Sequence, residues 1–166
     1  VGQSLGKGDY REIAHIIIRN LIIALIISIL LILLQSSILN GKNYFFKLES
    51  ETFNLIEKYI SIRIFSAPAE LMLYVLIGFY LGLQKTKISS SLSICFSIFN
   101  IIFSVYFVKY LNLNIFGVAL GTLVAAYLTN ILFLTYTYFF VIKNLKIIPR
   151  FQINIFLKKK IFRLFY

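Results

Sequence analysis

The stretch Ile60 to Leu83, ISIRIFSAPAELMLYVLIGFYLGL, constrains the fold most, because it is long and apolar yet contains ionisable side chains. As an α-helix it would be roughly 36 Å long at about 1.5 Å per residue, enough to cross a hydrocarbon core of about 30 Å. Arg63 and Glu70 would each cost on the order of 2.5 to 3.5 kcal/mol at the membrane centre, so we expect them to face protein or water. Pro68 removes a backbone donor, which a span tolerates where neighbours satisfy the freed carbonyl. The stretch therefore predicts a membrane span inside a packed helix bundle.

Composition extends this prediction to the whole chain. Of the 166 residues, 60% are hydrophobic and 14% are charged, and the mean hydropathy is +0.88. Soluble domains have roughly 45 to 50% apolar residues. The net charge of +11 comes from Lys and Arg that separate the apolar runs. This is the pattern of membrane topology and not of a solvated nucleic-acid-binding face, so the expected partner is the lipid bilayer and no nucleic acid.

Several classes of site are not expected. Cys95 is the one cysteine and His15 the one histidine, so neither a disulfide framework nor a metal site is predicted, and His15 is expected at the membrane interface. The opening VGQSLGKGD lacks the G-K-[ST] ending of a phosphate-binding loop. Without a catalytic triad or a dinucleotide fingerprint, we expect no enzyme, no catalytic residue and no cofactor. The chain starts at Val1 and not at Met, which suggests a fragment of a longer protein.

Four apolar runs predict an all-α fold, a polytopic membrane helix bundle with spans at about residues 16–39, 59–83, 88–108 and 115–142. Asp9 is placed to cap a helix that begins near Tyr10, and the apolar spacing around Ile56 starts the second helix near Ser50. Residues 1–148 would form this membrane domain. The basic and apolar tail that follows it predicts an amphipathic helix on the membrane surface.

Small residues at four-residue spacing predict where helices approach closely. Gly78 and Gly82 form a G-x-x-x-G pair in the second span. In the fourth span Gly117, Gly121 and Ala125 lie on one face. Such faces let another helix backbone come near, so both are predicted to be helix-packing surfaces.

Orientation follows from the distribution of basic residues. The first, third and fifth segments outside the apolar cores hold twelve Lys and Arg, and the second and fourth hold five when Arg63 is counted. Because basic residues accumulate on the cytoplasmic side, both termini are predicted to be cytoplasmic.

The segments VGQSLGKGD, RIFSAPAELMLYVLIGFYLGLQKTK, NIIFSVYFV and NIFGVALGTLVAAYL resemble, in order and spacing, the third to sixth helices of multidrug and toxic compound extrusion (MATE) transporters. The likeness is closest to a bacterial subgroup related to DNA-damage-inducible transporters. It implies four helices of a six-helix lobe, with residues 149–166 as a cytoplasmic linker toward a second lobe that the chain lacks. It also implies a secondary antiporter in the bacterial cytoplasmic membrane that exports small organic, often cationic compounds by alternating access, in exchange for H⁺ or Na⁺.

The subgroup carries an N-x-x-x-D motif in the third of these spans, and its carboxylate is implicated in cation coupling. Here Asn100 matches the asparagine, but Ser104 stands in the acidic position. A hydroxyl does not titrate in the physiological range, so the resemblance supplies no coupling acid at this position.

The candidates for the substrate or ion pathway are therefore Glu70, Asn100, Ser104 and Arg63, and each has a structural alternative. Glu70 either replaces the missing carboxylate or pairs with Arg63, two helical turns away on nearly the same face. Asn100 and Ser104, one turn apart, either line a cavity or bond across helices.

Two other functions remain open. One is a lipid-linked saccharide flippase of the same superfamily, for which more basic residues than Arg63 would be expected along the cavity. The other is a membrane remnant that does not transport.

Overall fold

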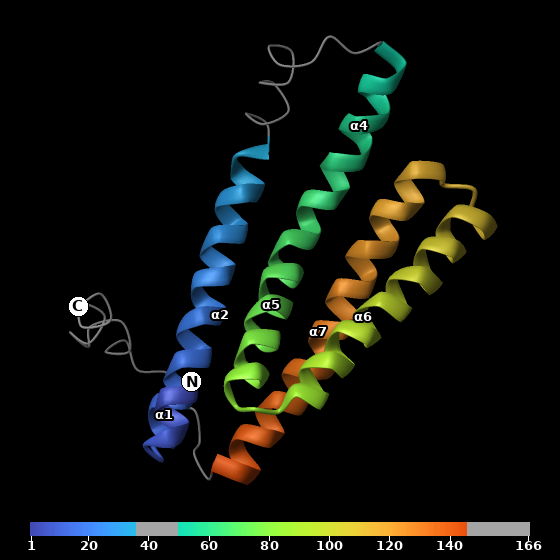
Figure 1. Cartoon of the computed structure of the whole chain (residues 1–166). Helices are drawn as coiled ribbons and strands as arrows, with labels where there is room; N and C mark the ends of the chain where they lie inside the picture. Colours follow the sequence, from blue (N-terminus) through green and yellow to red (C-terminus); the bar gives the residue numbers. More distant parts are fainter. Residues whose placement is uncertain (36–49, 146–166) are drawn as a thin grey trace.

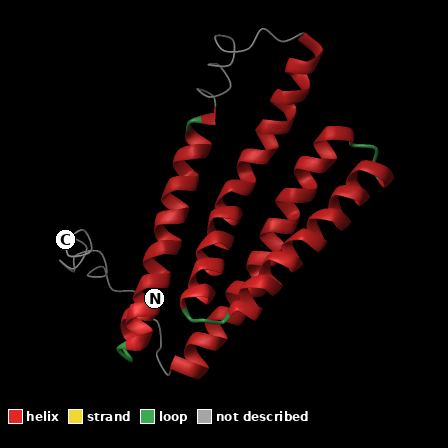
Figure 2. Ribbon diagram, viewed as in Figure 1, coloured by secondary structure: helices red, strands yellow, loops and turns green. Residues whose placement is uncertain are grey.

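The computed structural model describes residues 1–35 and 50–145, and the regular structure in this part of the chain is helical (Figure 2). Within these residues, four helices are long and apolar enough to cross a membrane: Tyr10–Leu33, Asn54–Gly82, Thr86–Tyr110 and Asn114–Phe140. The predicted all-α polytopic bundle is confirmed. The helix that contains the first predicted span begins at Tyr10, as the cap at Asp9 predicted. Residues 36–39 of that predicted span and the linker at 149–166 lie outside the described residues.

Consecutive spans run antiparallel (Figure 1). In chain order the elements are α1 (Gly2–Gly6), α2 (Tyr10–Leu33), α4 (Ser50–Arg63), the 3₁₀ turn η1 (Ile64–Ser66), α5 (Ala67–Gly82), α6 (Thr86–Val105), the π turn η2 (Tyr106–Tyr110) and α7 (Asn114–Leu145). Figure 1 shows α1, the start of α2, the α5–α6 turn and the end of α7 at the same end of the bundle.

Helix ends follow from local chemistry. The carboxylate of Asp9 accepts a hydrogen bond from the backbone N–H of Glu12 at 3.1 Å, which is an N-cap for α2. The turn after α5 places Gln84 in the left-handed region, at φ 60°. The N–H of Lys85 then donates to the carbonyl of Tyr80 at 2.8 Å, the bond of a Schellman turn. This compact turn sets α6 antiparallel to α5.

The second span is broken in its middle. Helix α4 ends at Arg63, η1 occupies three residues, and α5 begins at Ala67 with Pro68 in its first turn. Proline is accommodated in a first turn because its missing N–H would have no intrahelical partner there. The interruption that Pro68 predicted is therefore present as a 3₁₀ turn between two α-helical segments.

Helix α5 lies at the centre of the packing, in contact with α2, α6 and α7. The core is a cluster of buried residues from these four helices: Ile13, Ala14, Ile17, Ala69, Leu73, Leu76, Phe79, Tyr80, Leu83, Leu92 and Ala126. Tyr80 is fully buried, and its hydroxyl pairs with that of Thr137 at 2.8 Å. This bond ties α5 to α7 at the end of the bundle near the α5–α6 turn.

Helix α7 packs closely against the backbone of α6 and of η2, the turn that follows it. A Cβ at Gly121 would lie 2.6 Å from the amide nitrogen and 2.7 Å from the Cα of Ser104, and one at Gly117 would lie 2.9 Å from the carbonyl carbon of Phe107. Real Cβ atoms do not come this near to other atoms. Only glycine at these two positions of α7 therefore allows the observed distance between the helices. Ala125, one turn further along α7, is fully buried.

The two glycines of α5 differ from each other: Gly78 faces open space, whereas a Cβ at Gly82 would lie 2.8 Å from the Cβ of Val1, a close contact with the N-terminal residue. No described atom lies within 4 Å of a Cβ built at Gly78, and the nearest atoms at Gly82 belong to the side chain of Val1. Both glycines line an open groove of about 570 Å³ between α2 and α5. Isoleucines such as Ile23 line the α2 side. Close approach of two helices needs small residues on both, which explains why α2 does not come close to α5 along this groove.

Candidate functional site

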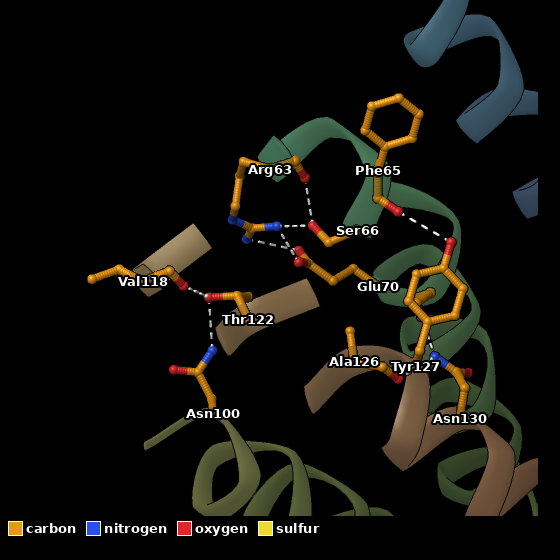
Figure 3. Close-up of polar contacts among 11 residues, drawn as sticks. Arg63, Phe65, Ser66, Glu70, Asn100, Val118, Thr122, Ala126, Tyr127 and Asn130 are labelled. Atoms are coloured by element: carbon orange, nitrogen blue, oxygen red, sulfur yellow. Dashed lines mark hydrogen bonds and ion pairs between the residues drawn. The ribbon is translucent and has the colours of Figure 1, made fainter. Parts of the chain in front are cut away.

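Arg63 and Glu70 form a salt bridge across the break in the second span (Figure 3). Nη1 of Arg63 contacts Oε1 of Glu70, and Nη2 donates to Oε2 at 3.0 Å. The contact is therefore bidentate, the geometry in which arginine binds carboxylates most strongly. The side chains are 32% and 18% exposed. Glu70 also lies in the first turn of α5, where the helix dipole favours a negative charge.

Ser66 completes this cluster from within η1. Its fully buried hydroxyl accepts a hydrogen bond from Nη1 of Arg63 and donates to the carbonyl of the same residue at 2.6 Å. The hydroxyl therefore satisfies a carbonyl at the break and orients the guanidinium toward Glu70. The sequence analysis did not single out Ser66, although its place between Arg63 and Pro68 was a usable signal.

Helix α7 binds the other side of the break (Figure 3). The hydroxyl of Tyr127 donates to the carbonyl of Phe65 at 3.1 Å. The amide nitrogen of Asn130 donates to the carbonyl of Ala69 at 2.6 Å and to that of Ala126 at 2.9 Å. Asn130 is 4% exposed. Two side chains of α7 thus hold carbonyls on both sides of Pro68.

Tyr127 and Asn130 were missed by the sequence analysis. Asn130 carried a signal, because an amide inside an apolar run is costly unless it is bonded. Its donors are both used, while its Oδ1 has no hydrogen-bond partner among the described residues.

Asn100 and Ser104 both face α7, but their surroundings differ. The amide nitrogen of Asn100 donates to the hydroxyl of Thr122 at 2.9 Å, and Thr122 donates to the carbonyl of Val118 at 3.1 Å. Asn100 thus makes the bond across helices that was one of its two alternatives. The buried hydroxyl of Ser104 lies against Gly121 and has no hydrogen-bond partner within residues 1–35 and 50–145.

The four predicted residues therefore fall into two groups. Arg63 and Glu70 form an ion pair at the break, and Asn100 and Ser104 lie on the α6–α7 interface. Neither group has the donor set of a metal site, and no three His, Cys, Asp or Glu side chains in the described part come together to hold a metal ion. The arrangement offers one mid-span carboxylate, Glu70, whose charge is balanced by Arg63.

Comparison with known proteins gives two matches. A model of the MatE family matches residues 1–106. Among curated proteins, DNA damage-inducible protein F of Escherichia coli (strain K12) is 30% identical over 127 residues, which are 76% of this chain. The match covers 28% of that relative, so the chain spans less than a third of its length. No solved structure matches the chain.

Proposed function

Since the chain belongs to the MatE family of membrane transporters, we propose that it forms part of a secondary antiporter that exports small organic, often cationic compounds by alternating access. The family match over residues 1–106 carries this proposal, since it includes the broken second span and the asparagine of the third. In a bilayer, ionisable and polar residues at mid-span are characteristic of substrate and ion pathways. The expected coupling ion is H⁺ or Na⁺.

The role we propose for Glu70 in this transporter is structural. Arg63 occupies both of its oxygens, and Ser66 holds the guanidinium in place. A coupling acid must release its partner in each cycle, whereas this pair closes the break between α4 and α5. Ser104 has a hydroxyl at the position where the subgroup has its carboxylate. The coupling carboxylate would therefore lie outside these four spans.

The ion pair also bears on the flippase alternative. A saccharide carried on a lipid phosphate or diphosphate needs basic side chains that are available to the anion. Arg63 is the basic residue that the sequence analysis offers for the cavity, and Glu70 neutralises it. This observation favours export of organic compounds over transport of an anionic lipid-linked sugar.

The test is efflux of a fluorescent organic cation from cells that lack their own drug pumps and express the reading frame containing this chain. Energised cells should lose the dye faster than cells with an empty vector, and an ionophore that collapses the coupling gradient should abolish the difference. Selective collapse of the H⁺ or the Na⁺ gradient identifies the ion. Protein that is present in the membrane, yet gives no efflux with a panel of dyes, would support the non-transporting alternative.

A further inference from the structure

The backbone hydrogen bonds around Pro68 are rearranged, because proline has no N–H. In a continuous α-helix the carbonyl of Ile64 would accept a hydrogen bond from residue 68, which proline cannot donate. The carbonyl accepts instead from the N–H of Ala67, which lies three residues on, as in a 3₁₀ turn. Ala67 would otherwise donate to the carbonyl of Arg63, so this second carbonyl also loses its α-helical partner.

Side chains supply donors to the carbonyls of the break (Figure 3). The hydroxyl of Ser66 donates to the carbonyl of Arg63 at 2.6 Å. From α7, the hydroxyl of Tyr127 donates to the carbonyl of Phe65 at 3.1 Å, and the amide of Asn130 binds a carbonyl in the first turn of α5. The bent backbone is therefore satisfied by donors from the break itself and from α7.

A straight second span would be less well bonded than the bent one. Straightening would return the N–H of Ala67 to the carbonyl of Arg63 and displace the hydroxyl of Ser66. The carbonyl of Ile64 would then have no donor, because Pro68 does not supply one. An unpaired carbonyl inside a bilayer is costly, so the bend is the favoured conformation.

The two halves of the span pack on different neighbours. In the described part of the chain, α4 packs mainly on α7, whereas α5 also contacts α2 and α6. A break between two halves that are held by different helices could act as a hinge. Tyr127 and Asn130 oppose this motion, because their bonds join α7 to carbonyls on both sides of Pro68.

We propose that the bonds of Ser66, Tyr127 and Asn130 make the break a fixed bend, so that α4, α5 and α7 move as one rigid unit. The unit extends the proposed function, because alternating access would then need its moving joint outside this break. The bend itself does not depend on transport.

The distance between two spin labels, measured by double electron–electron resonance, tests the bend. The labels are attached to Leu55→Cys on α4 and Ile131→Cys on α7, in the full reading frame that contains this chain, with Cys95 and any other native cysteine replaced by serine. The two labelled side chains are 43% and 60% exposed. Leu55 lies about 13 Å from η1 along α4, so a swing of about 20° would move it by about 5 Å.

The protein with labels alone should give one narrow distance distribution. Ser66→Ala and Tyr127→Phe each remove one donor to the break, and the double variant should broaden the distribution or add a second peak. Tyr74→Phe is the matched control, because it also removes a phenol hydroxyl, from a side chain of α5 that is 64% exposed and makes none of the bonds at the break. It should leave the distribution unchanged.

A broad or two-peaked distribution without these substitutions would overturn the proposal, because the break would then be a hinge. Each single variant is measured as well, so the test does not depend on folding of the double variant. Distributions as narrow as that of Tyr74→Phe in every variant that folds would also overturn the proposal, because the side-chain bonds would not set the bend. Failure of dye efflux would leave these distances unchanged, so the two proposals fail separately.

Discussion

At the scale of single residues, Glu70 shows how a charge can be kept at mid-span. Its two oxygens bind Arg63, and its place in the first turn of α5 adds the favourable end of the helix dipole. Loss of the carboxylate by mutation would leave the guanidinium without its partner. A charged group that loses its hydrogen bonds in a buried site costs about 1 to 3 kcal/mol or more. The salt bridge therefore stabilises the break in the second span.

Glu70→Gln should therefore lower the free energy of unfolding without abolishing the coupling of transport to the ion gradient. The amide keeps size and hydrogen bonding but loses charge, and we expect about 1.5 to 3 kcal/mol of destabilisation from the weaker bonds to Arg63. Transport driven by a pH gradient should persist in the folded protein. Thermal unfolding in detergent and pH-driven efflux measure the two effects.

Arg63→Gln is the matched control, and the double variant should lose less stability than the sum of the single ones, because the two residues interact directly. A folded Glu70→Gln protein that has lost efflux driven by a pH gradient would contradict the structural role. Glu70 would then be the coupling group, the other role that the sequence allows.

The pairing of Arg63 with Glu70 could be predicted because it is local: a separation of seven residues places both side chains on nearly the same helix face. The contacts from α7 could not. Tyr127 and Phe65 are 62 residues apart, and Asn130 and Ala69 are 61 apart. Which residues of two helices meet is set by how the helices pack, and no periodicity within either helix determines it.

At the scale of helices, the same small-residue spacing has two outcomes. Gly117 and Gly121 meet the backbone of α6, whereas Gly78 lies on an open groove. The difference comes from the opposing helix: Ser104 presents a small side chain to Gly121, while α2 presents isoleucines to the α5 groove. The spacing predicts that a helix face allows close packing, and the partner determines whether it occurs.

Gly121→Ala should reduce the amount of folded protein, and Gly121→Leu should reduce it further. The new Cβ would collide with backbone atoms of Ser104, which a side-chain rotation cannot relieve, and overpacking of this kind costs about 1 to 3 kcal/mol. Val118→Leu is the control, since it also adds one carbon to α7 but at a side chain that is 39% exposed.

Monodisperse protein recovered in mild detergent, compared with total protein in the membrane, gives the folded fraction. Equal folded fractions for Gly121→Ala and Val118→Leu would show that α6 and α7 do not pack as described.

At the scale of the whole molecule, the four antiparallel spans bring the start of α2 and the end of α7 to one end of the bundle (Figure 1). The α5–α6 turn, with Lys85 and Lys87, lies at the same end. The α6–α7 turn is at the opposite end and has Lys109 close by. By the positive-inside rule, the excess of basic residues at the first end predicts that this end faces the cytoplasm.

Topology reporters test this orientation. Fusions at Lys85 and Lys146 should give a cytoplasmic signal, and fusions at Asn43 and Asn112 an external one, as expected for a bacterial inner-membrane protein with both ends of this segment inside. Of these sites, Asn43 and Lys146 lie outside the described residues. A cytoplasmic signal at Asn43 would contradict the arrangement, because the segment between the first two spans is expected outside.

The salt bridge at the break closes within one span, over seven residues, so it can form as soon as that segment has been synthesised. A lone Arg or Glu at mid-span disfavours release from the translocon into lipid by about 2.5 to 3.5 kcal/mol. A neutral pair made within the segment reduces this penalty before any later helix exists. Tyr127 and Asn130 follow some 60 residues behind and bind a break that is already shaped. The second span can therefore enter the bilayer without waiting for the fourth.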